Sequence, residues 1–244
     1  MASPMEQFEV RPIVPLHVGN LDISFTNASL WMCIVVAAAA LFLTIGASSR
    51  RLVPTRMQSI TEMSYMFVSD MIRSAAGTEG LKFFPFVFTL FMFVLFSNVI
   101  GLFPLIHPFT VTSHIIVTFA LAAFIFIGVT VIGFAKHGAK FLKFFVPSGV
   151  PVVMLPLLVV IEIISYLTRP LSLSVRLFAN MMAGHTMLKV FGAFVVALGL
   201  LGGWAPLAFM VGFTGLEILV AFLQAYVFAI LTCIYLNDAL HMHH

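Results

Sequence analysis

One arginine, Arg176, stands near the middle of a strongly apolar part of the chain, in the stretch LSLSVRLFANMMAGH at residues 171–185. A charged side chain at the centre of a membrane helix costs about 2.5–3.5 kcal/mol on insertion scales, so such residues are rare and mark functional sites. Arg176 is therefore the first candidate functional residue, and the rest of the sequence must explain what it acts on.

A helix through this region would carry a single polar stripe. At about 100° per residue, positions four, seven or eleven apart lie on roughly the same helix face. The stripe comprises Glu162, Ser165, Arg169, Ser172, Arg176 and Asn180, while Leu, Val, Ile and Met dominate the other faces. Pro170 lies within it, removes one backbone hydrogen bond and can kink the helix. A polar stripe on an apolar helix suits a partly hydrated path.

The apolar region also holds groups that can exchange protons. Glu162, Glu217 and His185 can bind and release protons near neutral pH when their surroundings permit it. Arg176 cannot, because a guanidinium stays protonated. A line of titratable groups interrupted by a permanent cation describes a proton path with a barrier in it. Gln224, seven residues after Glu217, shares its helix face.

Helix packing offers an alternative explanation for the charged residues. Glu162 with Arg169, and Arg176 with Glu217, could be ion pairs that only fix how the helices pack. Lys189 is best explained as a side chain that extends its charge to the membrane surface.

The remaining polar residues of the apolar spans are further candidates. Asn98 could line a path or bond a neighbouring helix, and Tyr235 falls near the face of Glu217 and Gln224. Three histidines, His107, His114 and His137, lie at span ends, where interfacial polar residues are ordinary.

The composition excludes a water-soluble globule. Of the 244 residues, 61% are hydrophobic and 9% charged, against roughly 25% charged in soluble domains. The net charge of +3 does not indicate nucleic-acid binding, because the basic residues cluster between apolar spans. Cys33 and Cys233 lie inside spans and predict neither a disulfide nor a metal site. We expect no cofactor and no metal.

We predict an all-α integral membrane protein with about five membrane helices and one interfacial amphipathic helix. Residues 1–28 form a polar external N-terminal segment without a cleavable signal peptide, and residues 29–244 form a single membrane domain. Its expected elements are a first span at 29–49, an interfacial helix at 57–75, spans at 83–106 and 111–135, and long tilted helices at 151–203 and 205–236.

Two features give the orientation and the tilt. Basic clusters at residues 50–56 and 136–143 predict the inner side, so the N-terminus lies outside and the C-terminus inside. A helix over 151–203 would reach about 75 Å, against a hydrocarbon core of about 30 Å. It must be broken or steeply tilted, with a turn at Gly199, Gly202 and Gly203. Residues 237–244 are expected to be a solvated tail.

These residues resemble a known family. Residues 171–185 resemble the signature of subunit a of the F-type ATP synthase membrane sector, in the form SLxxRLxxNxxAGH. The last helix, with Glu217, LQA at 223–225 and LTCIY at 231–235, and the segment NVIGLFP at 98–104 resemble that family too. The resemblance covers the chain from about Ser29 onward. Histidine on the earlier helix and the acid on the later one resemble alphaproteobacterial and mitochondrial members.

The resemblance implies a role for each candidate residue. Arg176 would be the essential arginine, the gate that faces the carboxylate of the rotating c-ring on another chain. His185, Glu217, Asn180 and Gln224 would belong to the inlet half-channel, open to the outer side. Glu162 and Ser172 would form the exit half-channel. Arg169, Asn98 and Tyr235 are additional candidates.

The implied mechanism is proton conduction without bond chemistry. A proton would neutralise a c-ring carboxylate, which could then enter lipid, and Arg176 would promote its release and block a direct leak. The implied partners are the c-ring, b-type subunits of the peripheral stalk, the remainder of the ATP synthase and lipid, with no nucleic acid. The membrane would be a bacterial inner membrane or, alternatively, the mitochondrial one.

Two other functions remain open at the level of sequence. A proton-coupled secondary transporter would use Arg176 to bind an anionic substrate, but internal repeats, which are common in transporters, are not found here. A membrane scaffold would use the charges for packing alone. The choice between H⁺ and Na⁺ and the number of ring subunits cannot be read from this chain.

Overall fold

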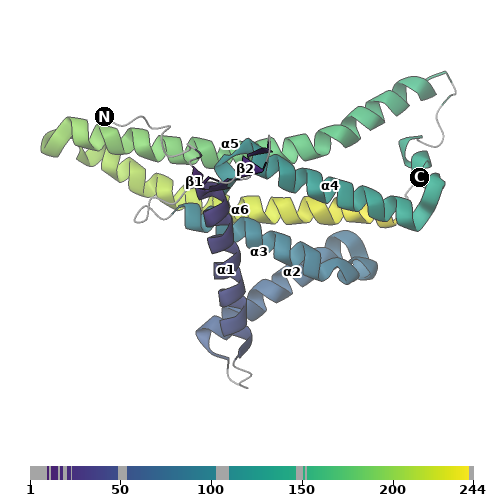
Figure 1. Ribbon diagram of the computed structural model, residues 1–244, viewed down its shortest axis with the longest axis horizontal. Helices are drawn as coiled ribbons and strands as arrows, with labels where there is room; N and C mark the ends of the chain where they lie inside the picture. The colour runs from purple at the N-terminus through teal and green to yellow at the C-terminus, as the bar shows by residue number, and fades with distance from the viewer. Residues whose placement is uncertain are drawn as a thin grey trace.

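The chain folds almost entirely into long helices (Figure 1). This computed structural model describes residues 10, 12–15, 17–18, 21–22, 24–48, 54–102, 110–146, 151 and 153–241. The α-helices are α1 (Asn27–Ser48), α2 (Arg56–Gly80), α3 (Phe84–Gly101), α4 (Ile115–His137), α5 (Leu155–Gly202) and α6 (Trp204–Leu240). Short 3₁₀ helices are η2 (Leu81–Phe83), η4 (Val111–Ser113) and η5 (Gly138–Phe145).

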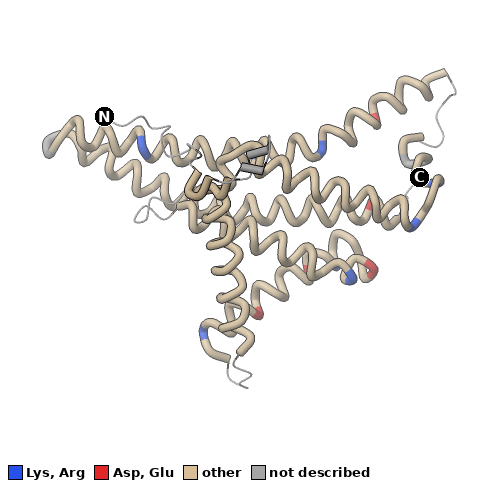
Figure 2. The backbone as a smooth tube through the Cα atoms, viewed as in Figure 1, with Lys and Arg blue, Asp and Glu red and all other residues tan. Residues whose placement is uncertain are grey.

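The predicted fold class is confirmed. Five stretches among the described residues are long and apolar enough to cross a membrane: Asn27–Ser48, Arg56–Gly101, Ile115–Leu142, Leu155–Gly199 and Trp204–Leu240. The second of these joins α2 to α3 through η2. Charged residues are sparse along the long helices (Figure 2), as the low charged content requires.

The N-terminal segment contains short strands that the sequence did not predict. Strand β1 (Pro12–Val14) pairs with β4 (Phe25–Thr26), and β2 (His17–Val18) pairs with β3 (Leu21–Asp22), both antiparallel. The hairpins lead directly into α1, where the Thr26 hydroxyl accepts a hydrogen bond from the Ser29 amide at 3.4 Å. A threonine in this position caps the start of a helix.

Helices α5 and α6 form an antiparallel hairpin that is the longest feature of the molecule (Figure 1). Their 48 and 37 residues correspond to about 70 and 55 Å. Gly199 has φ of 59°, a conformation that favours glycine, and its carbonyl accepts from the Gly203 amide at 2.8 Å. This is the turn that the glycines predict. Helix α1 runs steeply across the hairpin direction (Figure 1), so an upright α1 requires a strongly tilted hairpin.

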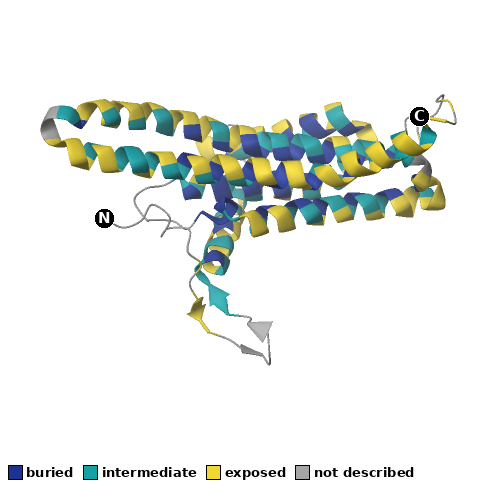
Figure 3. Ribbon diagram, turned by 90° about the horizontal axis from the view of Figure 1, so that it is seen from above, coloured by how far each residue is buried: buried dark blue, intermediate teal, exposed yellow. Residues whose placement is uncertain are grey.

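The core lies where α6 packs against the other helices (Figure 3). One face of α6 carries small residues at four-residue intervals, namely Ala221, Ala225, Ala229 and Cys233, all with no exposed surface. Small side chains let membrane helices approach closely. Facing them are buried aliphatic residues of α2, α3 and α5, among them Val68, Ile72, Val87, Val94, Leu173 and Leu177.

Helix α2 divides into two halves. Its second half is held in the core by Val68, Met71 and Ile72. Its first half exposes the apolar residues Met57, Ile60, Met63 and Phe67. Gln58 is buried and donates a hydrogen bond to Glu62 at 2.8 Å. The exposed apolar half suits a membrane environment.

The end of α6 differs from the expected solvated tail. The helix continues through Leu240, and Ala239 and Leu240 are buried. The Leu240 carbonyl lies 3.3 Å from His137 Nε2 of α4. The residues that contact this end of α6 belong to α4 and α5, which are far away in the sequence. The sequence alone therefore suggested a solvated polar tail. The last three residues, 242–244, lie outside the described part of the chain.

Candidate functional site

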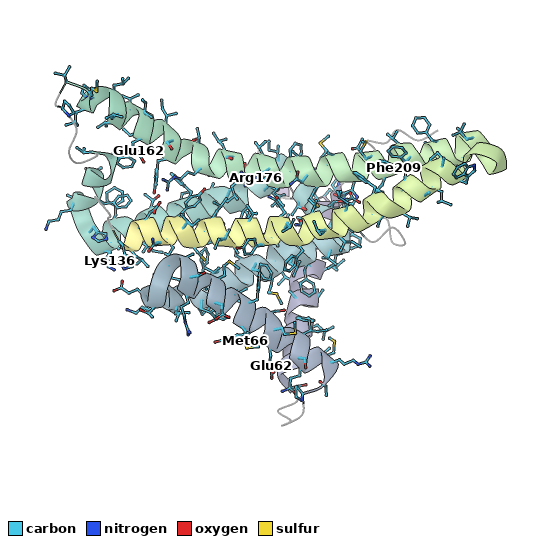
Figure 4. All side chains as sticks on the ribbon, turned by 180° about the vertical axis from the view of Figure 1, so that it is seen from behind. Glu62, Met66, Lys136, Glu162, Arg176 and Phe209 are labelled. Carbon is cyan, nitrogen blue, oxygen red and sulfur yellow. The ribbon has the colours of Figure 1, made fainter. Side chains whose placement is uncertain are left out.

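Arg176 is exposed near the middle of α5 (Figure 4). Ser172 and Asn180, one turn away on either side, are exposed with it, whereas Leu173 and Leu177 are buried in the core. The helix is anchored by its aliphatic face, and Ser172 and Arg176 of the polar stripe stay exposed. Among the described residues, no carboxylate forms an ion pair with Arg176.

An outward arginine in the middle of a membrane helix requires a compensating group. Exposed apolar side chains, among them Leu171 at 49% and Val175 at 46%, lie on the same stretch of α5. Charged residues in such positions face a protein interior or a hydrated cavity. The described part of the chain places no carboxylate in an ion pair with Arg176. The sequence alternative of an Arg176–Glu217 ion pair is not formed.

On the hairpin-turn side of Arg176, α5 meets the carboxyl group of Glu217. Glu217 is 4% exposed, and its carboxylate packs against Gly184, where a side chain would overlap Glu217 Oε1. His185 is the next residue of α5. His185 Nε2 and Glu217 Oε2 are both buried without a hydrogen-bond partner in the described structure. Two buried titratable groups thus lie at neighbouring positions of the α5–α6 contact.

A polar bridge connects this region to the vicinity of Arg176. Asn180 Nδ2 donates to Gln224 Oε1 at 3.0 Å. Arg176, Asn180 and Gly184 follow one another at one-turn intervals on α5, and Gln224 lies two turns after Glu217 on α6. Polar groups therefore occur at intervals along the hairpin from Glu217 to Arg176, with one hydrogen bond, Asn180–Gln224, between the two helices.

Asn98 is buried and links α3 to both η4 and α6. Its Nδ2 donates to the Ala221 carbonyl at 3.2 Å, and its Oδ1 accepts from the Thr112 hydroxyl at 2.9 Å. Ala221 lies between Glu217 and Gln224 on α6. Of the two roles that the sequence allowed for Asn98, the hydrogen bond to a neighbouring helix is the one formed.

On the other side of Arg176, the stripe extends along α5 towards Glu162 (Figure 4). Glu162 is half-buried and Ser172 exposed; ten residues separate them, about 15 Å of helix, so the two are not in contact. Arg169 does not pair with Glu162 but with Asp238 of α6, at 3.0 Å.

Tyr235 belongs to the surroundings of Arg169. The Arg169 guanidinium carbon lies 5.1 Å from the centre of the Tyr235 ring. Tyr235 shares the helix face of Gln224, as predicted, but eleven residues further on, about 16 Å along α6. It is therefore not a neighbour of Glu217.

Three contributing residues escaped the sequence analysis. Gly184 belonged to the motif, but the sequence assigned it no role of its own. Thr112 and Asp238 were not among the candidate residues. Asp238 lies two heptads after Gln224 and so shares its helix face. The sequence analysis missed this relation because it assigned residues 237–244 to a solvated tail. Of the histidines at span ends, His107 lies outside the described residues, while His137 reaches α6.

Comparisons with known proteins agree with this geometry. Residues 29–237 match the sequence profile of the family described as ATP synthase A chain. The chain is 65% identical to ATP synthase subunit a of Pelagibacter ubique over 243 residues, which cover 99% of both chains. It is 63% identical to the subunit a of a Chelativorans species, again over 99% of both chains. The subunit a of Rhizobium meliloti is 61% identical over 98% of this chain and 97% of its own.

The family profile covers every residue of the α5–α6 site from Glu162 to Tyr235. The relatives match over nearly their whole length. The chain therefore belongs to the family of ATP synthase subunit a, the membrane proton-channel subunit of the F-type ATP synthase stator.

Proposed function

We propose that Arg176 is the gate between two offset proton half-channels and acts on a carboxylate of the rotor c-ring. The observation that carries this proposal is the exposed position of Arg176 on α5, without an ion pair to any described carboxylate. A guanidinium so placed can attract a carboxylate that another subunit brings past it. It favours the ionised form of that carboxylate, since opposite charges stabilise each other.

The inlet half-channel comprises His185, Glu217, Asn180 and Gln224. The buried, unpartnered Nε2 of His185 and Oε2 of Glu217 support this assignment, because both groups can accept a proton. The Asn180–Gln224 hydrogen bond continues the polar series to Arg176. We infer that a proton reaches Glu217 and His185 first and then neutralises the ring carboxylate beside Asn180.

The exit half-channel comprises Glu162 and Ser172 on the opposite side of Arg176. Glu162 is half-buried and Ser172 exposed, and both belong to the polar stripe of α5, which supports a path along this helix. Glu162 is the titratable group of this half, and the hydroxyl of Ser172 can bind water between it and Arg176. Asn98, Arg169 and Tyr235 do not conduct; each holds helices together.

The gate follows from the chemistry of these groups. A ring carboxyl that has taken a proton is neutral and can turn into lipid, where its ionised form would be costly. When it returns to Arg176 from the other side, the guanidinium favours release of the proton towards Glu162. Arg176 itself stays protonated, so no proton passes directly between the half-channels. Each proton that crosses 100 mV supplies about 2.3 kcal/mol.

The subunit works within the ATP synthase complex. We propose that the exposed face of α5 meets the c-ring, that b-type subunits of the peripheral stalk bind the remaining surface, and that residues 29–244 form one membrane domain. We further propose that the N-terminus lies outside and the C-terminus inside a bacterial inner membrane. The Lys136–Glu79 ion pair at 2.6 Å and the His137–Leu240 contact support a common inner side for the ends of α2, α4 and α6.

The experiment that tests this function compares Arg176→Ala with the native chain in inverted membrane vesicles that contain the whole complex. The measurement is ATP-driven proton pumping at equal amounts of assembled complex. The matched control is Lys189→Ala, which removes an exposed cation thirteen residues further along the same helix. We expect pumping to be lost in Arg176→Ala and kept in Lys189→Ala. Native pumping by Arg176→Ala would refute the gate and leave Arg176 a packing role.

A further inference from the structure

We infer that Arg169 and Asp238 are positioning residues, an ion pair that keeps Arg176 at the correct height along α6; this rests on the proposed role of Arg176. Arg169 Nη1 and Asp238 Oδ2 are 3.0 Å apart, and the side chains are 21% and 33% exposed. The pair joins α5 to the last turn of α6 across 69 residues of sequence. An ion pair of this length, largely removed from solvent, is stronger than one at a free surface.

Two tyrosine rings fix the orientation of the guanidinium. The Arg169 Cζ lies 5.3 Å from the centre of the Tyr166 ring and 5.1 Å from that of Tyr235. Both distances fall within about 6 Å, the range of cation–π attraction. Tyr235 and Asp238 are three residues apart on α6, so α6 holds the arginine at two points. A planar guanidinium suits this arrangement and a lysine does not.

Tyr166 carries the connection on to α4. Its hydroxyl lies 2.8 Å from Thr130 Oγ1. The Thr130 hydroxyl donates its own proton to the Phe126 carbonyl at 2.7 Å, so the Tyr166 hydroxyl is the donor to Thr130. The Tyr166 ring also packs against the rings of Phe126 and Phe145, at 4.8 and 5.4 Å between centres. Arg169 is thus part of a connection through α4, α5 and α6.

The connection stands beside a proline within α5. Pro170, the next residue, has no amide proton, so the helix lacks the bond that would join residue 170 to the Tyr166 carbonyl. A long helix with a proline bends at that point unless neighbouring elements hold it. Two contacts hold α5 just before this proline. Arg169, one residue before it, pairs with Asp238, and Tyr166, four residues before it, bonds Thr130.

Arg176 lies between two attachments of α5 to α6. Asn180–Gln224 is one turn away on one side, and Arg169–Asp238 is seven residues away on the other, about 10 Å of helix. Without the second attachment, polar contacts hold this part of α5 to α6 on one side of Arg176 only, and the buried Leu173 and Leu177 are left to set its position. We then expect Arg176 to shift relative to both half-channels, with weaker coupling and a direct proton leak.

The test uses Arg169→Gln, Asp238→Asn and the exchanged pair Arg169→Asp with Asp238→Arg, each in the whole complex in vesicles. The measurement is the number of protons pumped per ATP hydrolysed, at equal amounts of assembled complex. We expect each single variant to lower this ratio and to increase passive leak. The exchanged pair should restore at least half of the native ratio.

A purely structural role predicts a different result. Less complex would assemble, but the complex that did assemble would pump the native number of protons per ATP, and that outcome would overturn the inference. Asp238→Asn, which keeps size and shape, is the variant that secures an assembled sample. The control is Lys136→Gln with Glu79→Gln, a second ion pair between helix ends that is 38% and 49% exposed; its ratio should stay native.

Arg176→Ala, measured in parallel, separates the two proposals. If Arg176→Ala pumps normally, the proposed function fails. If Arg176→Ala loses pumping while Arg169→Gln and Asp238→Asn keep the native ratio, the inference on the pair fails and the gate stands.

Discussion

At the scale of single residues, Gly184 shows why the motif requires a glycine. The Glu217 carboxylate occupies the space that a side chain at position 184 would need. Glycine is thus required here for close approach and not for its backbone conformation. The residue controls where the buried acid lies relative to His185.

We predict that Gly184→Ala displaces Glu217 and slows proton pumping by about 10- to 100-fold, the effect of a misplacement near 1 Å at a reacting group. Gly192→Ala is the matched control, because a methyl group there would meet only Met210 Sδ at 3.9 Å. Initial rates of ATP-driven acidification in vesicles measure the difference. Equal rates for the two variants would contradict the placement of Glu217.

The sequence could predict part of the site at this scale. The common face of Arg176, Ser172 and Asn180 follows from helical spacing alone, and the structure exposes all three. The partner of Arg169 could not be predicted, because both Glu162 and Asp238 fit the spacing on their own helices. Which of the two acids pairs with Arg169 depends on how α5 is aligned against α6. The spacing of residues within one helix gives no information on that alignment.

At the scale of elements, α6 depends on its row of small residues. Ala221, Ala225 and Ala229 are completely buried, so α6 can approach α2, α3 and α5 closely. The sequence predicted a long helix here, but its hydrophobicity did not distinguish the buried alanine face from the lipid-exposed faces.

We predict that Ala225→Leu lowers the stability of the fold by about 1–3 kcal/mol, the usual cost of overpacking. Ala208→Leu, at an exposed position of the same helix, should have little effect. The two variants are compared by the temperature at which the purified complex in detergent loses the subunit during a temperature ramp. A native transition for Ala225→Leu would show that α6 packs less closely than described.

The Asn98 bridge is the second element-scale feature. We predict that Asn98→Ala costs about 1 kcal/mol, the size of a hydrogen bond between membrane helices, because the Thr112 hydroxyl loses its acceptor and the Ala221 carbonyl its donor. Thr89→Ala on the same helix is the control, since Thr89 bonds only the Pro85 carbonyl of its own helix. The same temperature ramp should rank Asn98→Ala below Thr89→Ala; the reverse order would contradict the bridge.

At the scale of the whole molecule, the tilt of the hairpin follows from length and from packing. Helix α5 has 48 residues, more than twice the roughly 20 that cross a bilayer. The sequence therefore predicted a tilt but not its direction, which depends on α1 crossing the hairpin steeply (Figure 1). The strands before α1 could not be foreseen either, because two- and three-residue strands carry no periodic signal.

The proposed orientation makes a prediction for cysteine labelling in vesicles, after Cys33 and Cys233 are replaced by alanine. Ile13→Cys on β1 should react with a membrane-impermeant maleimide from the outer side only. Leu142→Cys on η5 should react from the inner side only. Both positions are at least half exposed. The opposite pattern would invert the topology and exchange the inlet with the exit.

The central claim is that Arg176 separates two half-channels, and passive proton conduction tests it most directly. The catalytic head is removed from vesicles that contain the native or the Arg176→Ala subunit, and the ring carboxylates are then blocked with a carbodiimide. In the native membrane we predict that the block stops conduction, because every proton must travel on the ring. In Arg176→Ala we predict a leak that persists after the block. A variant membrane as tight as the native one would show that Arg176 does not separate the two paths.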